Sequence, residues 1–258
     1  EDENMLIERK NFIREGDVHS HYEWRNTGCA LNSTKKLISY AQKHKKNIHI
    51  LHISTKEEIE YARNNKAFFT MEATPQHLTM HAPECYEKLN TLAQINPPIR
   101  TKDHLNGIWE GVIENIIDII GSDHAPHTIK QKQNKYPKSP SGMPGVQTVG
   151  LIMADYALKK KISFKKLVDL LCTNPCKIFG IKDRGVIKEG YFADFTIYNL
   201  NKKYEIKNDW IASNCGWTAF DGLVLGLSPF GTLINGNVVV WDNKIQKNVK
   251  YGKPLNFN

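Results

Sequence analysis

Residues 47–62 read NIHILHISTKEEIEYA, and this stretch decides the fold. Its first part, residues 47–53, is a compact apolar run rich in β-formers, which predicts a strand. The segment 54–58 then carries a capping signal for a helix that continues through Ala62. A strand followed at once by a helix is the repeating unit of a parallel α/β fold.

The same alternation recurs on both sides of this stretch. We predict helices over residues 33–43 and 103–115, and strands over residues 67–72 and 116–121. Parallel βα units bring the ends of their strands to one rim of a barrel, where reactive side chains gather. The fold class is therefore predicted to be α/β, with a partial TIM-type (β/α)8 barrel.

The second half of the chain has a different pattern of predicted elements. Residues 128–145 are poor in apolar side chains and predict a long surface loop. Further helices are predicted over 148–158 and 163–172, and strands over 193–198 and 232–241, the last folded back at Asn235-Gly236. Two domains are expected: the barrel in residues 1–180, and a barrel-closing segment with a small β domain in residues 181–258.

Composition excludes several classes of protein. The net charge of +8 comes from scattered lysines without interleaved aromatic motifs, which indicates solvated faces and no nucleic-acid partner. No stretch approaches the ~20 apolar residues of a membrane helix. Five cysteines without a CxxC pair favour reduced thiols, and the acidic start Glu1–Asn4 lacks the features of a signal peptide. We therefore expect a cytoplasmic location and no membrane partner.

His52 is the first candidate for chemistry. It stands where the strand 47–53 runs out before a helix cap, so its imidazole is expected at the barrel mouth. His49 has the opposite parity in the strand and is not expected to share that pocket. A strand histidine taken alone is more often a core or surface residue than a metal ligand.

Asp123 is the second candidate, within GSDHAPH (residues 121–127), again at the end of an apolar strand. An aspartate there can bind a divalent metal through one oxygen and move a proton with the other. The alternative is an Asx turn that closes the strand, with Pro126 ending it. The histidines that follow Asp123 on a βα barrel favour catalysis.

Five motifs in this order resemble the dihydroorotase branch of the amidohydrolase superfamily. They are IHILHISTKEE (48–58), ATPQHL (73–78), INPPIR (95–100), GSDHAPHT (121–128) and SPSGMPGVQ (139–147). Later, DRGVIKEGYFADFTIYNL (183–200) and CGWTAFDG (215–222) resemble the C-terminal region of that family, where a small β-sandwich follows the barrel. IKEGYFADF is shared widely among amidohydrolases, so it supports the superfamily and not the substrate.

The resemblance implies roles for individual residues and a dinuclear zinc centre in the complete protein. His52 matches a ligand of the second zinc, and Asp123 matches the ligand of the first zinc that also acts as general base and acid. His127 matches a substrate-contacting histidine, and Asn96 matches a position that binds the amide or carboxylate edge of the substrate. Gly145 would offer its backbone N–H to the substrate ring.

The departures from the family pattern concern the metal site. Gln76 replaces the first of two adjacent histidines, which we expect to tune packing or specificity, and His77 is expected to be structural. The family places an HxH pair on its first strand, and Glu1–Asn4 resembles the residues just after another ligand histidine, so the chain is expected to be N-terminally incomplete. Residues 19–21 (HSH) mimic the missing pair, but no apolar strand leads into them, and we expect an exposed loop.

By this resemblance the complete protein interconverts N-carbamoyl-L-aspartate and L-dihydroorotate, a step of pyrimidine synthesis. The implied substrate is a small molecule, and a homodimer is expected. One alternative is a related ring amidase, a dihydropyrimidinase or allantoinase. Another is a non-catalytic homologue that serves as a scaffold subunit.

Overall fold

The computed structural model describes residues 1–246 and 251–257. The chain divides into two compact units. The first unit contains Glu1–Val149 and Lys207–Asp221, and the second contains Gly150–Ile206 and Gly222–Asn258. In the described part of the chain, no helix has the length and apolar character needed to cross a membrane.

The first unit contains a parallel sheet whose middle strand is β2. Its order is β1-β2-β3, with β1 at Ile48–Ile50, β2 at Phe69–Ala73 and β3 at Ile119–Ile120. Buried apolar side chains such as Ile50, Met71 and Ile119 line these short strands. The sheet confirms the parallel βα pattern predicted from the sequence.

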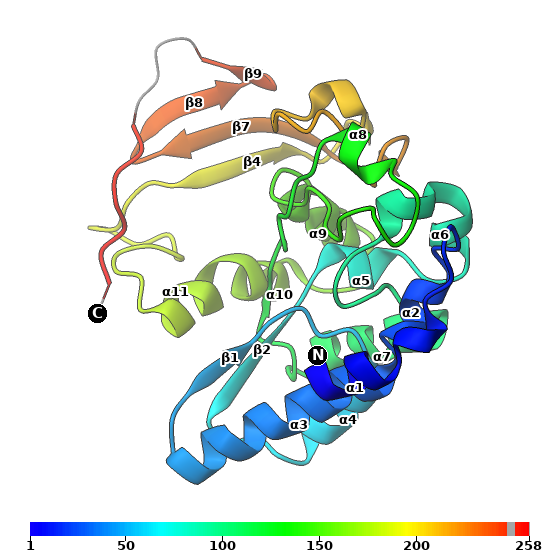
Figure 1. Ribbon diagram of the computed structural model, residues 1–258. Helices are drawn as coiled ribbons and strands as arrows, with labels where there is room; N and C mark the ends of the chain where they lie inside the picture. The colour runs from blue at the N-terminus through cyan, green and yellow to red at the C-terminus, as the bar shows by residue number, and fades with distance from the viewer. Residues whose placement is uncertain (247–250, 258) are drawn as a thin grey trace. The chain divides into compact units, whose positions relative to one another are not determined.

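Three long helices accompany this sheet: α3 (Thr27–His44), α4 (Lys56–Arg63) and α7 (Lys102–Ile113). The helix α4 begins with a capping box, in which the Thr55 hydroxyl accepts from the backbone N–H of Glu58 and the Glu58 carboxylate accepts from that of Thr55. This confirms the predicted start of the helix. Figure 1 shows α3 and α4 running side by side near β1 and β2.

The rest of the first unit consists of short elements. They are α1 (Glu3–Glu8), α2 (Ser20–Trp24), α5 (Pro75–Thr79), α6 (Glu84–Leu89) and α8 (Ile129–Lys132), with 3-10 turns at Lys10–Phe12, Asn90–Ala93 and Asn208–Trp210. A core cluster that includes Tyr86, Ile99 and Trp217 joins several of them. Trp217 belongs to the segment Lys207–Asp221, which explains why this late segment is part of the first unit.

The segment 128–145 differs from the surface loop predicted from the sequence. It contains α8, and its side chains Lys132, Tyr136 and Ser139 are buried. The Lys132 ammonium donates to the backbone oxygens of Gln94 and Pro140 at 2.9 and 2.8 Å. The low apolar content was misleading because this segment is anchored by polar side chains.

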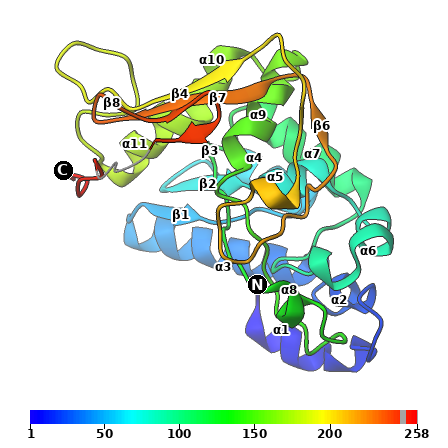
Figure 2. The same ribbon diagram turned by 90° about the horizontal axis from the view of Figure 1, so that it is seen from above.

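The second unit begins with helices and continues into antiparallel strands. The helices are α9 (Val149–Leu158), α10 (Phe164–Val168), a π-helical turn at Asp169–Thr173 and α11 (Asn174–Phe179). One sheet has the order β4-β7-β8-β9, with β4 at Phe195–Asn199, β7 at Ser228–Ile234, β8 at Asn237–Trp241 and β9 at Lys244–Ile245. A smaller pair joins β5 (Tyr204–Glu205) to β6 (Val224–Leu225). Figure 2 shows β4, β7 and β8 as one layer.

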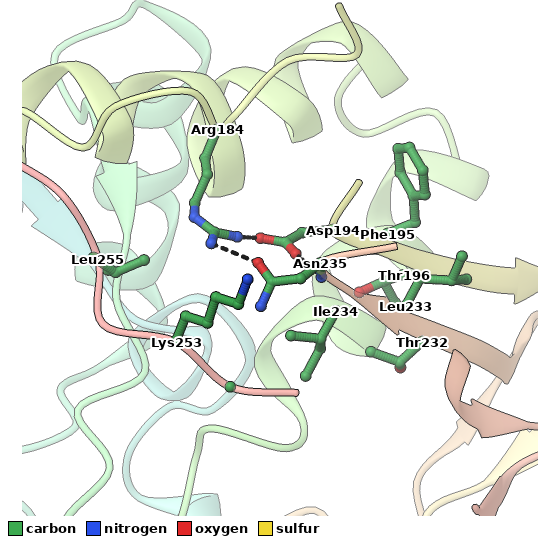
Figure 3. A pocket seen from close by; sticks show the side chains of 11 residues that line it. Arg184, Asp194, Phe195, Thr196, Thr232, Leu233, Ile234, Asn235, Lys253 and Leu255 are labelled. Atoms are coloured by element: carbon green, nitrogen blue, oxygen red, sulfur yellow. Dashed lines mark hydrogen bonds and ion pairs between the residues drawn. The ribbon is translucent and has the colours of Figure 1, made fainter. Parts of the chain in front are cut away.

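The hairpin between β7 and β8 turns at Asn235-Gly236, as the sequence predicts. Both residues have positive φ, 50° and 80°, which suits the primed turns favoured in tight hairpins. The same asparagine lines a cavity of about 350 Å³ in the second unit, where its side-chain oxygen accepts from the Arg184 guanidinium. Figure 3 shows that guanidinium between Asp194 and Asn235, so its charge is already paired with the Asp194 carboxylate.

Candidate active site at the strand ends

The ends of the three parallel strands lie at one edge of the sheet, and two of the predicted site residues follow within three residues of a strand end. His52 comes after β1 and Asp123 after β3. Both have left-handed backbones, with φ of 38° and 43°. This conformation is uncommon for residues other than glycine and is concentrated at functional sites.

Asp123 and His52 lie close enough to influence each other electrostatically, together with Glu72 at the end of β2. Burial raises the pKa of the Asp123 carboxyl, the His52 imidazole opposes that rise, and the Glu72 carboxylate adds to it. We call His52, Glu72 and Asp123 the strand-end cluster. The two residues on which the sequence-based hypothesis depended therefore lie at the same edge of the sheet, within electrostatic range of each other.

Glu72 is a member of this cluster that the sequence analysis missed. Its carboxylate lies so close to Gly121 that an added Cβ would sit 2.5 Å from Oε1, so the glycine leaves room for it. A signal was available, because Glu72 is an acidic residue near the end of a strand that stops at Thr74-Pro75. The reasoning applied to His52 and Asp123 covers it equally.

His49, which was not expected to share the pocket of His52, contacts another member of the cluster, Glu72. Its Nε2 is 3.3 Å from Glu72 Oε2, and its Nδ1 is 2.7 Å from Thr70 Oγ1. Strand alternation holds for His49, Thr70 and Glu72, which share one face. It fails at His52, which lies beyond the end of β1 and has positive φ, so parity does not separate the two histidines.

Gln76 and His77, in α5, are buried beside the cluster. His77 Nδ1 is 2.9 Å from Thr74 Oγ1, and its Nε2 is 3.1 Å from the Pro97 carbonyl oxygen, so both ring nitrogens are bonded. Burial lowers the pKa of His77 to about 3, and the nearby His52 contributes to the shift. The amide nitrogen of Gln76 donates to the Ser122 carbonyl at 3.0 Å, while its buried Oε1 has no partner among the described residues.

Gly145 stands next to Ser122, and the approach leaves no space for a side chain. A Cβ at this position would lie 2.3 Å from the Ser122 carbonyl oxygen. The backbone N–H of Gly145, expected to face the substrate, donates to His124 Nδ1 at 3.1 Å. A cavity of about 270 Å³ is lined by His124, Gly145 and residues 211–213 of the same unit.

The other two predicted substrate contacts lie on neighbouring segments. His127 donates from Nε2 to the Ser141 carbonyl oxygen at 3.2 Å. Asn96 is exposed, and its side-chain oxygen lies 3.1 Å from His21 Nε2. His77 links the segment of Asn96 to the strand-end cluster, because it bonds Pro97 and lies near His52.

The HSH sequence at residues 19–21 is not the exposed loop expected from the sequence. Ser20 begins α2, and His21 is only 1% exposed. The missing apolar strand correctly argued against a strand end, but a short helix satisfies the same pattern. Tyr86, stacked against Tyr22 and near His19, belongs to the core that covers this helix.

Two members of the cluster, the His52 imidazole and the Asp123 carboxylate, have atoms that suit a zinc ion as ligands. Within the described ranges 1–246 and 251–257, no three or more His, Cys, Asp or Glu side chains come together as a ready metal site. The His52 ring and the Asp123 carboxylate form no hydrogen bond with the described residues, in contrast to His77. Both side chains therefore have atoms available to bind a metal ion, and both are held by uncommon backbone conformations, which fits a partial metal site.

Comparisons with known proteins agree with this geometry. The sequence model of the amidohydrolase family matches residues 20–239. The dihydroorotase of Methanosphaera stadtmanae is 31% identical over 250 residues, covering 95% of this chain and 57% of that protein. The dihydroorotase of Archaeoglobus fulgidus is 38% identical over 174 residues, covering 67% of this chain and 41% of that protein. The chain belongs to the amidohydrolase family.

Solved structures support the same fold. The L-hydantoinase (dihydropyrimidinase) of Arthrobacter aurescens has a TM-score of 0.87 at 22% identity, covering 94% of this chain and 55% of that one. The dihydropyrimidinase of Brevibacillus agri has a TM-score of 0.84 at 20% identity, with shares of 94% and 55%. The chain thus spans about half the length of the curated relatives and solved structures that it matches.

Proposed function

We propose that the protein containing this chain is a zinc-dependent dihydroorotase, which interconverts N-carbamoyl-L-aspartate and L-dihydroorotate. The observation that carries this proposal is the position of His52 and Asp123 after the ends of β1 and β3, at one edge of the parallel sheet of an amidohydrolase whose curated relatives are named dihydroorotase. The substrate is then a small cyclic amide.

His52 and Asp123 would hold the zinc, together with further ligands of the complete protein. When bound, zinc supplies a Lewis acid that polarises the amide carbonyl and lowers the pKa of water. A cation would also offset the burial and the Glu72 charge that raise the pKa of Asp123, and so keep its carboxylate ionised.

Asp123 would move the proton of the reaction. In the hydrolytic direction its carboxylate accepts a proton from the attacking water and delivers it to the ring nitrogen as the carbon–nitrogen bond breaks. Asn96 and His127 would bind the polar edges of the substrate. Gly145 would bind it through its backbone N–H, which requires the substrate to replace His124 as the acceptor.

We also propose the finer features expected from the sequence. The parallel strands in residues 1–180 would form part of a (β/α)8 barrel, and residues 181–258 would close it and add a small β-sandwich domain. A cytoplasmic location fits a chain whose five cysteines are all free, and the complete protein would form a homodimer.

The test is a substrate comparison with the protein made from the complete reading frame that contains this chain. Hydrolysis of dihydroorotate, dihydrouracil, hydantoin and allantoin is measured at equal enzyme concentration, with zinc content determined on the same sample. We expect kcat/KM to be highest for dihydroorotate. A preference for dihydrouracil, hydantoin or allantoin would replace the proposed substrate with that ring, and no turnover with bound zinc would favour a scaffold role.

A further inference from the structure

His21 joins α2 to the segment that carries Asn96. Its Nε2 lies 3.0 Å from the Ile95 carbonyl oxygen and 3.1 Å from Asn96 Oδ1. A carbonyl oxygen can only accept, so Nε2 carries the hydrogen and donates. Nδ1 is then the acceptor, and it faces the Tyr136 hydroxyl at 3.4 Å.

The His21 ring donates this hydrogen bond in its neutral form. Burial lowers the pKa of His21 to about 3, so the imidazole stays neutral throughout the physiological range. Its tautomer is fixed by partners on both nitrogens. The buried Tyr136 also packs edge-on against it, with ring centroids 5.6 Å apart.

Asn96, which accepts the hydrogen bond from His21, is an exposed residue within a buried segment. It is exposed, while the residues around it from Ala93 to Ile95 and from Pro97 to Arg100 are buried. An exposed asparagine side chain ordinarily samples several rotamers. With Oδ1 held by His21, the Nδ2 hydrogens are presented in a defined direction away from the buried ring.

We propose that His21 is a positioning residue for Asn96, orienting the Asn96 amide so that Nδ2 donates to an acceptor oxygen of the substrate. This inference rests on the proposed function, since it concerns the same site. His21 would not touch the substrate itself. The HSH sequence would then serve substrate binding, although it does not form a metal-binding pair.

A purely structural role is the competing explanation, because His21 also bonds Ile95 and Tyr136. The two explanations differ in their dependence on Asn96. A structural role weakens the protein whether or not Asn96 is present, whereas a positioning role has no effect on binding once the Asn96 side chain is removed.

The test is a double-mutant cycle in the complete protein, with His21→Leu, Asn96→Ala and the double variant. We expect His21→Leu to raise KM for dihydroorotate on the order of 10-fold while kcat changes less, as for a lost binding interaction. In the Asn96→Ala background the same change should alter KM by less than about twofold. His21→Gln, whose amide nitrogen can replace Nε2, should restore most of the affinity.

A second readout does not depend on activity. The side-chain amide of Asn96, identified in ¹⁵N spectra by its loss in Asn96→Ala, should shift in His21→Leu and recover in His21→Gln. His19→Leu is the matched control at the N-cap of the same helix, because the His19 ring lies against Tyr86, and it should leave KM and this signal unchanged.

Equal effects of His21→Leu in both backgrounds, with an unchanged Asn96 signal, would overturn the proposal. If the wild-type protein neither binds nor converts dihydroorotate, the proposed function fails. The Asn96 signal alone then decides whether His21 orients this side chain.

Discussion

The first unit contains two sets of polar side chains that contrast in how their atoms are satisfied. In the strand-end cluster, His52 and Asp123 have left-handed backbones and form no hydrogen bond with the residues that the structure describes. His21 and His77, in short helices, are buried and have both ring nitrogens bonded. All three histidines lie in sequence contexts that could suggest a metal ligand.

This difference separates groups that stabilise the fold from groups available for chemistry. A buried imidazole with both ring nitrogens bonded stabilises the fold, and its burial opposes protonation. A residue held at positive φ costs about 1–3 kcal/mol, which persists only where the surrounding structure imposes it. The contrast predicts that changes in the strand-end cluster mainly alter catalysis, and that changes in the buried histidines also alter stability, which for His21 comes in addition to its proposed effect on Asn96.

Asp123→Asn gives the largest expected effect. The amide keeps the size of the side chain but cannot accept the proton, so kcat for dihydroorotate should fall by about 10³-fold or more. The thermal midpoint should stay close to that of the wild type, because no hydrogen bond within the described residues is lost. Steady-state kinetics and calorimetry on the complete protein check both values.

Asp103→Asn is the matched control for this change. Asp103 is exposed on α7 and pairs with Lys56, so its replacement should leave kcat unchanged. Retained turnover in Asp123→Asn would remove this residue from the mechanism. The strand-end cluster would then no longer be distinguished from the buried histidines by a role in catalysis.

Gly145→Ala tests a position that is expected to affect both stability and substrate binding. The added methyl would lie 2.3 Å from the Ser122 carbonyl oxygen and 3.1 Å from Gln76 Nε2, so the backbone beside Asp123 must shift. Overpacking of this kind costs about 1–3 kcal/mol of unfolding free energy. We also expect a higher KM, because Gly145 is a proposed substrate contact.

Denaturant titration and kinetics measure these two effects. Gly252→Ala is the control, since a Cβ there meets nothing within 4 Å and its φ is not positive. Equal stability and equal KM for Gly145→Ala and the wild type would show that this loop is too compliant to form a defined subsite.

The dependence of stability on pH in the acid range tests whether His21 is neutral in the folded protein. The pKa of His21 falls from 6.5 to about 3 on folding, because burial disfavours the charged ring. Between these values the unfolded chain binds more protons than the folded one, so unfolding free energy falls as pH falls from 6.5 towards 3. One such group contributes a slope of up to about 1.4 kcal/mol per pH unit.

His21→Gln should reduce this slope, because glutamine does not titrate. Urea unfolding from pH 7 to pH 4 measures it, with His19→Gln as the control. An identical slope in the wild type and His21→Gln would mean that the His21 ring is protonated in the folded protein, contrary to its neutral role beside Asn96.

Periodicity was sufficient to predict much of this fold. The apolar runs at 47–53 and 67–72 correspond to β1 and β2, and the capping signal at Thr55 corresponds to the start of α4. Local chemistry determines these features, since caps and strand alternation involve residues close in sequence. The hairpin at Asn235-Gly236 was predictable for the same reason.

The site was predictable only where a residue comes soon after the end of a strand. His52 and Asp123 were found by that rule, whereas Glu72 needed the close approach at Gly121, which depends on pairing between β2 and β3. The burial of His21 and Lys132 depends on contacts with residues 75 and 38 positions away in the chain. No local pattern encodes such contacts. The polar segments that contain these residues were therefore predicted to be exposed, although both side chains are buried.

Lys132 gives the smallest expected effect and extends the contrast to alkaline pH. Burial lowers its pKa from 10.5 to about 7, so between these values the unfolded chain binds more protons than the folded one. Unfolding free energy should therefore rise as pH increases from 7 to 10. The slope should stay below about 1.4 kcal/mol per pH unit, because the Gln94 and Pro140 carbonyls favour the charged form.

Lys132→Met keeps the length of the side chain and removes the titrating group. We expect lower stability, since two buried carbonyls lose their donor, and a flatter dependence on pH between 7 and 10 than in the wild type. Lys138→Met, exposed in the same segment, should leave the slope unchanged. If Lys132→Met and the wild type show the same slope, the Lys132 ammonium stays charged in the folded protein, and its two carbonyl partners outweigh its burial.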